Sequence, residues 1–365
     1  MQVVFRADAS SSIGSGHVVR CLTLAQALRK AGGEVLFVCR EHKGHLADWI
    51  GAEGHSVVLL PLQTSSDDGS YRYAGWLGAD VATDASQTIA AIQSAGFKPA
   101  WVIVDHYAID AYWERRVGDS GSLIMAIDDV ADRLHDCDIL LDQNLVPNMY
   151  TRYSGLVPQR AVQLLGPRYV LLQSSYRQWH DQIVDRSADP ARLFCYFGAS
   201  DPHGLSLAAL EAVLDLKLPD LRADFVLGPY ATDRRRIIEL AGGHAGIVIH
   251  EKLPSLAELM VEADLALGAG GATSWERICL GLPALVVTLA ENQRPIASAL
   301  HELHLVYWLG DGRSTGRAEF RVALQNNLRP QGTGWFDRNF ASGIDGRGAD
   351  RVVNAILDRM GERQI

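Results

Sequence analysis

The stretch VVFRADASSSIGSGHVVRCLTLAQALRKAGGEVLFVCR, residues 3 to 40, decides the fold class. Two short apolar runs, VVFRA and EVLFVCR, flank a longer segment whose apolar residues recur every three or four positions. Short apolar runs are typical of buried strands, and the wider spacing is typical of an amphipathic helix. The order strand, helix, strand predicts a parallel β-sheet with helices on its faces.

The same alternation continues along the chain. In the first half, WVIVD, LIMAIDD and ILLDQ predict further buried strands at residues 101–105, 123–129 and 139–143. The second half starts again with LFCYFGAS and continues through ADFVLG, GIVIH, LALGAG and PALVVTLA. The sequence therefore predicts an α/β protein with two doubly wound, Rossmann-like domains facing a cleft.

A polar stretch at residues 177–192, RQWHDQIVDRSADPAR, separates the two halves. We place the boundary just before it, with an N-terminal domain over 1–172 and a C-terminal domain over 173–344. The segment 345–365 contains ADRVVNAILDRM, whose spacing predicts a separate C-terminal helix. The polar, glycine-rich residues 65–80 predict a mobile surface loop.

Composition limits the classes of partner. The 365 residues are 48% hydrophobic and 21% charged, which is typical of a globular protein. A formal charge of −9 opposes a broad nucleic-acid or acidic-membrane surface. No apolar run is long enough to span a membrane, and Met1 leads into a strand-like segment without a signal-peptide pattern, so we expect a cytoplasmic protein, as a monomer.

The sequence offers no metal motif. Five cysteines lie far apart without a CxxC pair, and the histidine pairs His42/His45 and His301/His304 have no third ligand at a motif distance. We expect reduced, mostly buried thiols, no metal site and no cofactor.

The first candidate site lies where the first strand meets the first helix. Gly14 and Gly16 permit a tight turn, and His17 falls at the start of the helix. The partial positive charge of a helix N-terminus disfavours a protonated imidazole, so His17 is suited to accept a proton. The alternative is that Gly14 and Gly16 only form a turn and that His17 only caps the helix or packs against it. Val19 stands where a dinucleotide fingerprint requires a third glycine, which argues against NAD.

Two glycine-rich turns in the second half are suited to phosphate. Ser200 follows a predicted strand in GASDP, and Gly270, Gly271 and Thr273 lie between a strand and a helix in GAGGATSWER. Glu276, one turn into that helix, is placed to accept hydrogen bonds from a ribose diol. A first-turn acid that only satisfies the helix dipole is the alternative.

Polar residues also follow other predicted strands. Asp105 and His106 come after WVIV, and Asn292 and Gln293 come after LVVTLA. Strand ends of a parallel sheet line the ligand crevice, so these side chains are candidates for binding the hydroxyl and amide groups of a sugar. Each is alternatively a turn or cap residue.

Six blocks together resemble the PseG family, UDP-2,4-diacetamido-2,4,6-trideoxy-β-L-altropyranose hydrolases. The resemblance spans roughly residues 2 to 300, and residues from about 310 onward carry no motif of the family. The blocks are RADASSSIGSGHVVRCLTLAQAL, VDHYAIDAYWE, IDDVADRLHDCDILLDQN, LLGPRYVLL, GASDP and GAGGATSWERICLGLPALVVTLAENQ.

The resemblance implies a MurG-like GT-B fold whose N-terminal domain meets the sugar and whose C-terminal domain holds UDP. It implies that His17 is the general base that activates water against the anomeric carbon, in pseudaminic acid biosynthesis. Asn292 matches the family asparagine on the side of the sugar and leaving group. Similarity to GT-B enzymes places Glu276 at the ribose. The diphosphate residues implied are Gly270, Gly271, Thr273 and Ser200.

The chemistry of the residues agrees with this implication. A nucleoside diphosphate is a good leaving group, so its cleavage needs charge stabilisation more than a second carboxylic acid. Three alternatives stay open: a MurG-like glycosyltransferase, a hydrolysing UDP-sugar 2-epimerase, and a nucleotide-sugar sensor without catalysis.

Overall fold

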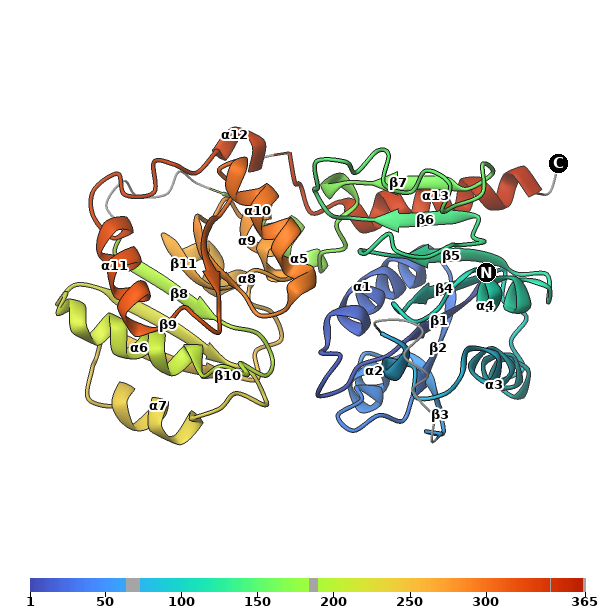
Figure 1. Ribbon diagram of the computed structural model, residues 1–365, viewed down its shortest axis with the longest axis horizontal. Coiled ribbons are helices and arrows are strands. Elements are labelled where there is room, and N and C mark those ends of the chain that lie inside the picture. Colours follow the sequence, from blue (N-terminus) through green and yellow to red (C-terminus); the bar gives the residue numbers. More distant parts are fainter. Residues whose placement is uncertain (64–72, 184–189, 342, 364–365) are drawn as a thin grey trace. The chain divides into compact units, whose positions relative to one another are not determined.

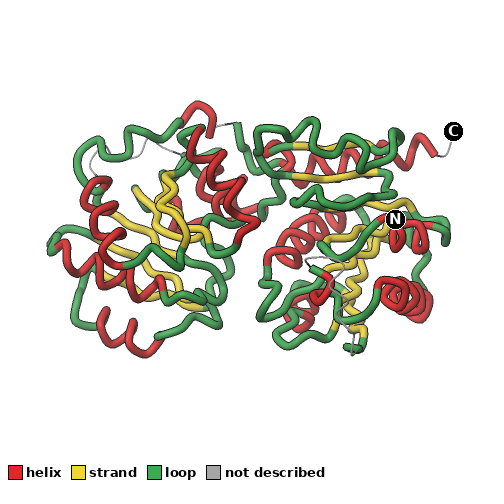
Figure 2. The backbone as a smooth tube through the Cα atoms, in the orientation of Figure 1, coloured by secondary structure: helices red, strands yellow, loops and turns green. Residues whose placement is uncertain are grey.

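The computed structural model describes residues 1–63, 73–183, 190–341 and 343–363. The chain forms two compact units. Unit 1 contains Met1–Asn144, Asn148–Leu171 and Arg347–Ile365, and unit 2 contains Leu145–Pro147 and Leu172–Gly346. In each unit, helices flank a sheet of strands (Figure 2).

Unit 1 is built on a seven-stranded parallel sheet (Figure 1). Its strand order is β3-β2-β1-β4-β5-β6-β7. The chain adds β2 and β3 on one side of β1 and then adds β4 to β7 on the other side, as in doubly wound folds. The strands are β1 (Gln2–Ala7), β2 (Glu34–Arg40), β3 (Ser56–Leu60), β4 (Trp101–Asp105), β5 (Leu123–Ile127), β6 (Ile139–Asp142) and β7 (Val162–Leu165).

Helices connect these strands, and one further helix of unit 1, α13 (Gly348–Arg363), comes from the C-terminal end of the chain. Val352, Val353 and Ile356 of α13 join the same buried core as Leu24 and Ala25 of α1. The predicted C-terminal helix is therefore part of unit 1. The helices are α1 (Gly16–Lys30), α2 (Ala47–Ala52), η1 (Ala74–Trp76), α3 (Val81–Ser94), α4 (Ala111–Gly118), η2 (Pro167–Tyr169) and α13 (Gly348–Arg363).

Unit 2 is built in the same way, on a six-stranded sheet. The order β10-β9-β8-β11-β12-β13 is again parallel, with its reversal between β8 and β11. The strands are β8 (Arg192–Tyr196), β9 (Arg222–Leu227), β10 (Ile247–Glu251), β11 (Leu265–Ala269), β12 (Ala284–Thr288) and β13 (Tyr307–Asp311). The helices are α5 (Ser174–His180), α6 (Leu205–Leu216), α7 (Arg234–Ala241), α8 (Ala257–Glu262), α9 (Thr273–Cys279), η3 (Glu291–Gln293), α10 (Arg294–Glu302), α11 (Arg317–Asn327) and α12 (Arg338–Ala341).

These two sheets confirm the predicted α/β class with two doubly wound domains. The polar stretch after Leu172 contains one helix that its composition did not predict, α5. Of the predicted loop, residues 65–72 lie outside the described residues, while 73–80 include η1 and the buried Tyr73. All five cysteines are buried free thiols. No described helix is long and apolar enough to cross a membrane.

Candidate active site

His17 is held by a short turn between β1 and α1. Gly14 has a φ of +84°, a left-handed conformation that favours glycine, and its N–H donates to the carbonyl of Ser10 at 2.9 Å. The hydroxyl of Ser10 in turn accepts from the N–H of Ile13 at 2.9 Å. Gly16 is the first residue of α1, so His17 stands in its first turn, 7% exposed.

The ring of His17 is oriented by Asp105. Its Nδ1 lies 2.6 Å from Oδ1 of Asp105, the last residue of β4. Because an ionised carboxylate only accepts, Nδ1 carries the hydrogen, and the other ring nitrogen, Nε2, is left with its lone pair. Nε2 has no hydrogen-bond partner among the described residues. A histidine oriented in this way by a carboxylate is suited to accept a proton.

Asp105 is kept ionised by a second partner, Arg20. The guanidinium donates from Nε to Oδ2 at 2.5 Å and from Nη2 to Oδ1 at 2.6 Å. Burial alone would raise the pKa of Asp105, but the charge of Arg20 and the hydrogen bonds from Arg20 and His17 hold that pKa well below its usual range. The carboxylate therefore stays charged throughout the neutral range.

Sequence reasoning missed Arg20. Its position three residues after His17 places both side chains on one face of α1, and that spacing was the available clue. Arg20 also donates to Oδ2 of Asp129 at 2.7 Å, and the hydroxyl of Tyr107 donates to the same atom at 2.7 Å. The ring of Tyr107 stands edge-on to His17 with centroids 4.6 Å apart. The network thus fixes His17 from two sides.

His106 points elsewhere. Its Nδ1 accepts from the N–H of Ala108 at 3.1 Å, and its buried Nε2, which makes no hydrogen bond, lies 3.5 Å from Oδ2 of Asp8. Burial lowers the pKa of His106 to about 4, so the ring is neutral at neutral pH. Its predicted contact with substrate stays a prediction.

In unit 2 the glycine-rich turn after β11 lies beside the end of β12. The N–H of Gly270 donates to the carbonyl of Val287 at 2.8 Å. A Cβ on Gly271 would lie 3.4 Å from Nε2 of Gln293, whose Oε1 accepts from the N–H of Leu289 at 2.9 Å. The structure therefore brings Gly271 and Gln293 together, as parallel strand ends require.

Glu276 lies one turn into α9 with its carboxyl inside the protein. Burial raises its pKa, while a hydrogen bond with the hydroxyl of Tyr176 acts in the opposite direction. Oε2 of Glu276 is buried and has no hydrogen-bond partner among the residues that the structure describes. A carboxylate that served only the helix dipole would remain solvated, so the free oxygen favours a role in binding.

The remaining predicted residues also follow strands of unit 2. Asn292 lies in η3, and Ser200 follows β8, the neighbour of β11 in the sheet. Next to Ser200, the carboxylate of Asp201 accepts from the N–H groups of Leu205 and Ser206, both at 2.8 Å, and so caps α6. The predicted residues thus divide between the two units, and the structure brings Asp105 to His17 in unit 1 and Gln293 to Gly271 in unit 2.

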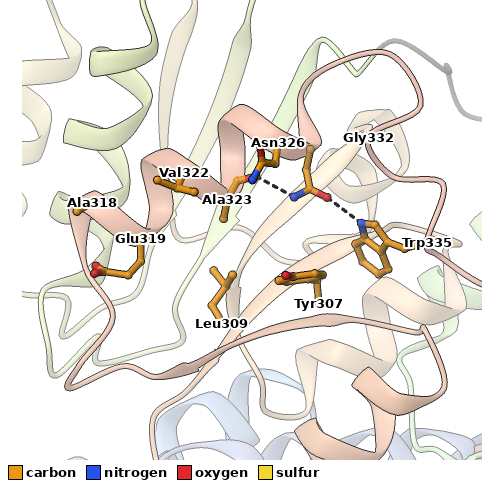
Figure 3. A pocket seen from close by; sticks show the side chains of 10 residues that line it. Tyr307, Leu309, Ala318, Glu319, Val322, Ala323, Asn326, Gly332 and Trp335 are labelled. Carbon is orange, nitrogen blue, oxygen red and sulfur yellow. Dashed lines mark hydrogen bonds between the residues drawn. The ribbon is translucent and has the colours of Figure 1, made fainter.

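A separate cavity of about 520 Å³ lies between β13 and α11 (Figure 3). Asn327 fixes one wall, since its Nδ2 donates to the carbonyl of Ala323 at 2.8 Å and its Oδ1 accepts from Nε1 of Trp335 at 2.7 Å. None of the predicted site residues lines this cavity. In the described part of the chain, no group of three or more His, Cys, Asp or Glu side chains is arranged to hold a metal ion.

The two units together have the GT-B fold of the structural neighbours. MurG of Acinetobacter baumannii aligns with a TM-score of 0.65 and 14% identity, covering 98% of this chain and 99% of that one. A putative UDP-N-acetylglucosamine 2-epimerase of Listeria monocytogenes aligns with a TM-score of 0.60 and 13% identity, covering 99% and 97%. No protein-family model matches the chain.

The resemblance to the PseG hydrolases is confirmed by sequence comparison. The UDP-2,4-diacetamido-2,4,6-trideoxy-β-L-altropyranose hydrolase of Campylobacter jejuni is 26% identical over 301 residues, which cover 82% of this chain and 96% of that protein. An uncharacterized protein of Methanocaldococcus jannaschii is 24% identical over 301 residues, 80% of this chain and 57% of its own length. The Bacillus subtilis spore coat polysaccharide biosynthesis protein SpsG is 29% identical over 219 residues, covering 55% and 59%.

Proposed function

We propose that this protein is an enzyme that hydrolyses a UDP-linked diacetamido-trideoxy sugar to UDP and the free sugar. The hydrogen bond between Nδ1 of His17 and Asp105 carries the proposal, because it leaves Nε2 as the proton acceptor of an oriented base. The similarity to the Campylobacter hydrolase over 82% of the chain supports the choice of substrate and a place in nonulosonic (pseudaminic) acid biosynthesis.

In the proposed reaction, Nε2 of His17 takes a proton from water while the water oxygen attacks C1 of the sugar. The bond between C1 and the UDP oxygen breaks, and UDP leaves with the electron pair. Attack from the side opposite the leaving group inverts the configuration at C1. The imidazolium that forms is stabilised by the Asp105 carboxylate, which stays ionised beside Arg20.

The turns of unit 2 would bind the leaving group. The backbone N–H of Gly271, with the hydroxyls of Thr273 and Ser200, is suited to the diphosphate, and the free Oε2 of Glu276 is suited to a ribose hydroxyl. The N–H of Gly270 is already bonded to Val287, so Gly270 would contribute by letting the chain approach the diphosphate closely. Asn292 and Gln293 would contact the sugar beside the diphosphate. In unit 1, Gly14 and Gly16 would line the sugar side, and the buried Asp105 would act through His17. A contact between the sugar and His106, which is buried beside Asp8, stays a prediction.

The test is incubation of the purified protein with the UDP-sugar and no acceptor, followed by measurement of UDP. We expect UDP and free sugar in equal amounts. UDP release only after addition of a hydroxyl acceptor would instead identify a glycosyltransferase. Solvent deuterium at C2 of the product would identify a hydrolysing 2-epimerase, and tight binding without turnover would identify a sensor.

A further inference from the structure

Arg277 of α9 is a fully buried arginine beneath the glycine-rich turn of unit 2. Its side chain is 0% exposed and is among the largest completely buried side chains of the protein. It directly follows Glu276, one turn after Thr273. Charged side chains are almost never completely buried unless they are paired, so this position requires an explanation.

The guanidinium contacts both ends of the turn. Its Nη2 donates to the carbonyl of Ala269, where β11 ends, and to Oγ of Ser274 at 3.2 Å, where α9 begins. Its Nη1 lies against Gly268, because a Cβ on that glycine would be 2.8 Å away. One side chain therefore ties the entry of the turn to its exit and leaves Gly270 and Gly271 between the two anchored points.

The guanidinium of Arg277 forms no ion pair with a carboxylate of the described residues. Nε and Nη1 are buried without a hydrogen-bond partner, and no described carboxylate forms an ion pair with the group. Burial lowers its pKa to about 10, with the neighbouring Glu276 acting in the opposite direction, so the guanidinium remains charged at neutral pH. An unpaired buried charge is costly to keep.

A bound anion would supply the missing charge. The turn above Arg277 presents backbone N–H groups at a strand-to-helix junction, the usual geometry of a phosphate site. Inside the protein the effective dielectric constant is low, so a charge below the turn acts on an anion above it more strongly than it would through water.

We propose that Arg277 is a positioning residue for diphosphate binding, which fixes the turn between Ala269 and Ser274 and places a positive charge beneath it. The inference rests on the proposed function, since the ligand is the diphosphate of UDP. Arg277 touches the turn and not the ligand. Its effect is therefore expected to scale with the phosphate charge of the ligand and to be absent for the nucleoside alone.

The experiment measures the affinity of UDP and of uridine for the wild-type protein and for Arg277→Met by calorimetry. Met keeps most of the volume and removes the charge. We expect UDP to bind about tenfold or more weakly to the variant, as for loss of one charge-assisted interaction, and uridine to bind within about twofold of wild type. Arg317→Met, which removes an exposed arginine paired with Asp215, is the control and leaves both affinities unchanged.

Unchanged UDP affinity in a folded Arg277→Met protein would overturn the proposal. So would an equal loss for UDP and uridine, because a general disturbance of the site does not distinguish phosphate. If Arg277→Met does not fold, Arg277→Lys is measured instead. Because lysine keeps the charge, we expect this variant to fold and to keep the ratio of UDP affinity to uridine affinity that the wild type shows. Failure of both variants to fold would show that Arg277 serves only the fold. Absence of UDP binding to wild type would instead contradict the proposed function.

Discussion

Nδ1 of His17 and Oδ1 of Asp105 lie 2.6 Å apart although 88 positions separate them in the chain. Parallel pairing of β1 with β4, in which Ala7 is the partner of Asp105, brings them to the same edge of the sheet. The turn after β1 then returns His17 over the end of β4. The topology of unit 1 thus brings the proposed base next to the carboxylate that orients it.

The first prediction is that His17→Asn lowers turnover by about 100-fold or more and leaves UDP affinity within a few fold of wild type. Asparagine can accept or donate a hydrogen bond but cannot take up the proton of water, so the loss is in the chemical step. Steady-state kinetics and UDP calorimetry measure both quantities. His304→Asn, at an exposed site with a left-handed backbone that asparagine tolerates, is the control. Near-normal turnover in folded His17→Asn would contradict the assignment of His17 as the general base.

The second prediction is that Asp105→Asn lowers turnover by about 100-fold while UDP affinity changes little. The amide no longer fixes the tautomer of His17 and no longer stabilises the imidazolium. It also leaves Arg20 with one carboxylate fewer, so the free energy of unfolding falls by about 3 to 5 kcal/mol, as for a broken buried ion pair. Asp110→Asn, a conservative change at the N-cap of α4, is the matched control. Unaltered kcat in folded Asp105→Asn would separate Asp105 from catalysis.

The third prediction concerns stability at alkaline pH. His135 is buried with Nδ1 2.7 Å from Oε1 of Glu114, and Asp128 is also close. Burial alone would lower the pKa of His135, but these two carboxylates raise it to about 9.

Because that pKa lies above the unfolded value of 6.5, the stabilisation is complete below pH 6.5 and is lost as pH rises through 9. We expect the free energy of unfolding to fall by about 3 kcal/mol over this interval in urea titrations. His135→Gln removes most of the pH dependence. An equally steep decline in that variant would show that other groups cause it.

The fourth prediction is that Glu276→Ala weakens UDP binding by about 1.5 to 3 kcal/mol, the range for a hydrogen bond to a charged group. The observation behind it is the buried Oε2 without a partner. Calorimetry with UDP measures the loss, and Glu258→Ala, an exposed first-turn acid of α8, controls for removal of charge. Equal UDP affinity of Glu276→Ala and wild type would show that Glu276 interacts only with the helix dipole.

Most strands of the fold were predictable because they are apolar runs that end in polar or glycine residues, whereas β7 and β13 were not predicted. WVIVD became β4 and PALVVTLA contains β12, since buried parallel strands need continuous apolar sequence. The amphipathic spacing of α13 was equally clear. Its return to unit 1 was not, because an apolar stripe does not specify the surface that it covers. The helix α5 was missed because SSYRQWH has no apolar period.

The candidate site was predictable where local chemistry marks it, as in GSGH and GAGGATS. It was not predictable where a residue acts through a distant partner. Arg20 and Arg277 each lie inside a helix, and only the tertiary structure brings Arg20 to Asp105 and Arg277 under the turn at Ala269. The sequence spacing between Arg20 and Asp105, 85 positions, carries no local pattern.

The last prediction concerns the bond that breaks. If His17 activates water against C1, reaction in oxygen-18 water places the label on the C1 hydroxyl of the sugar and leaves UDP unlabelled. Attack on phosphorus would do the reverse. The oriented base is in unit 1, whereas the turns suited to phosphate are in unit 2, and this division favours attack on carbon. Hydrolases that attack phosphorus commonly use metal ions held by clustered carboxylates, and no such group of ligands was predicted from the sequence. Mass spectrometry of both products after a single turnover measures the label, and a reaction in unlabelled water provides the baseline. Label in UDP would overturn both the role of His17 and the proposed division of labour between the two units.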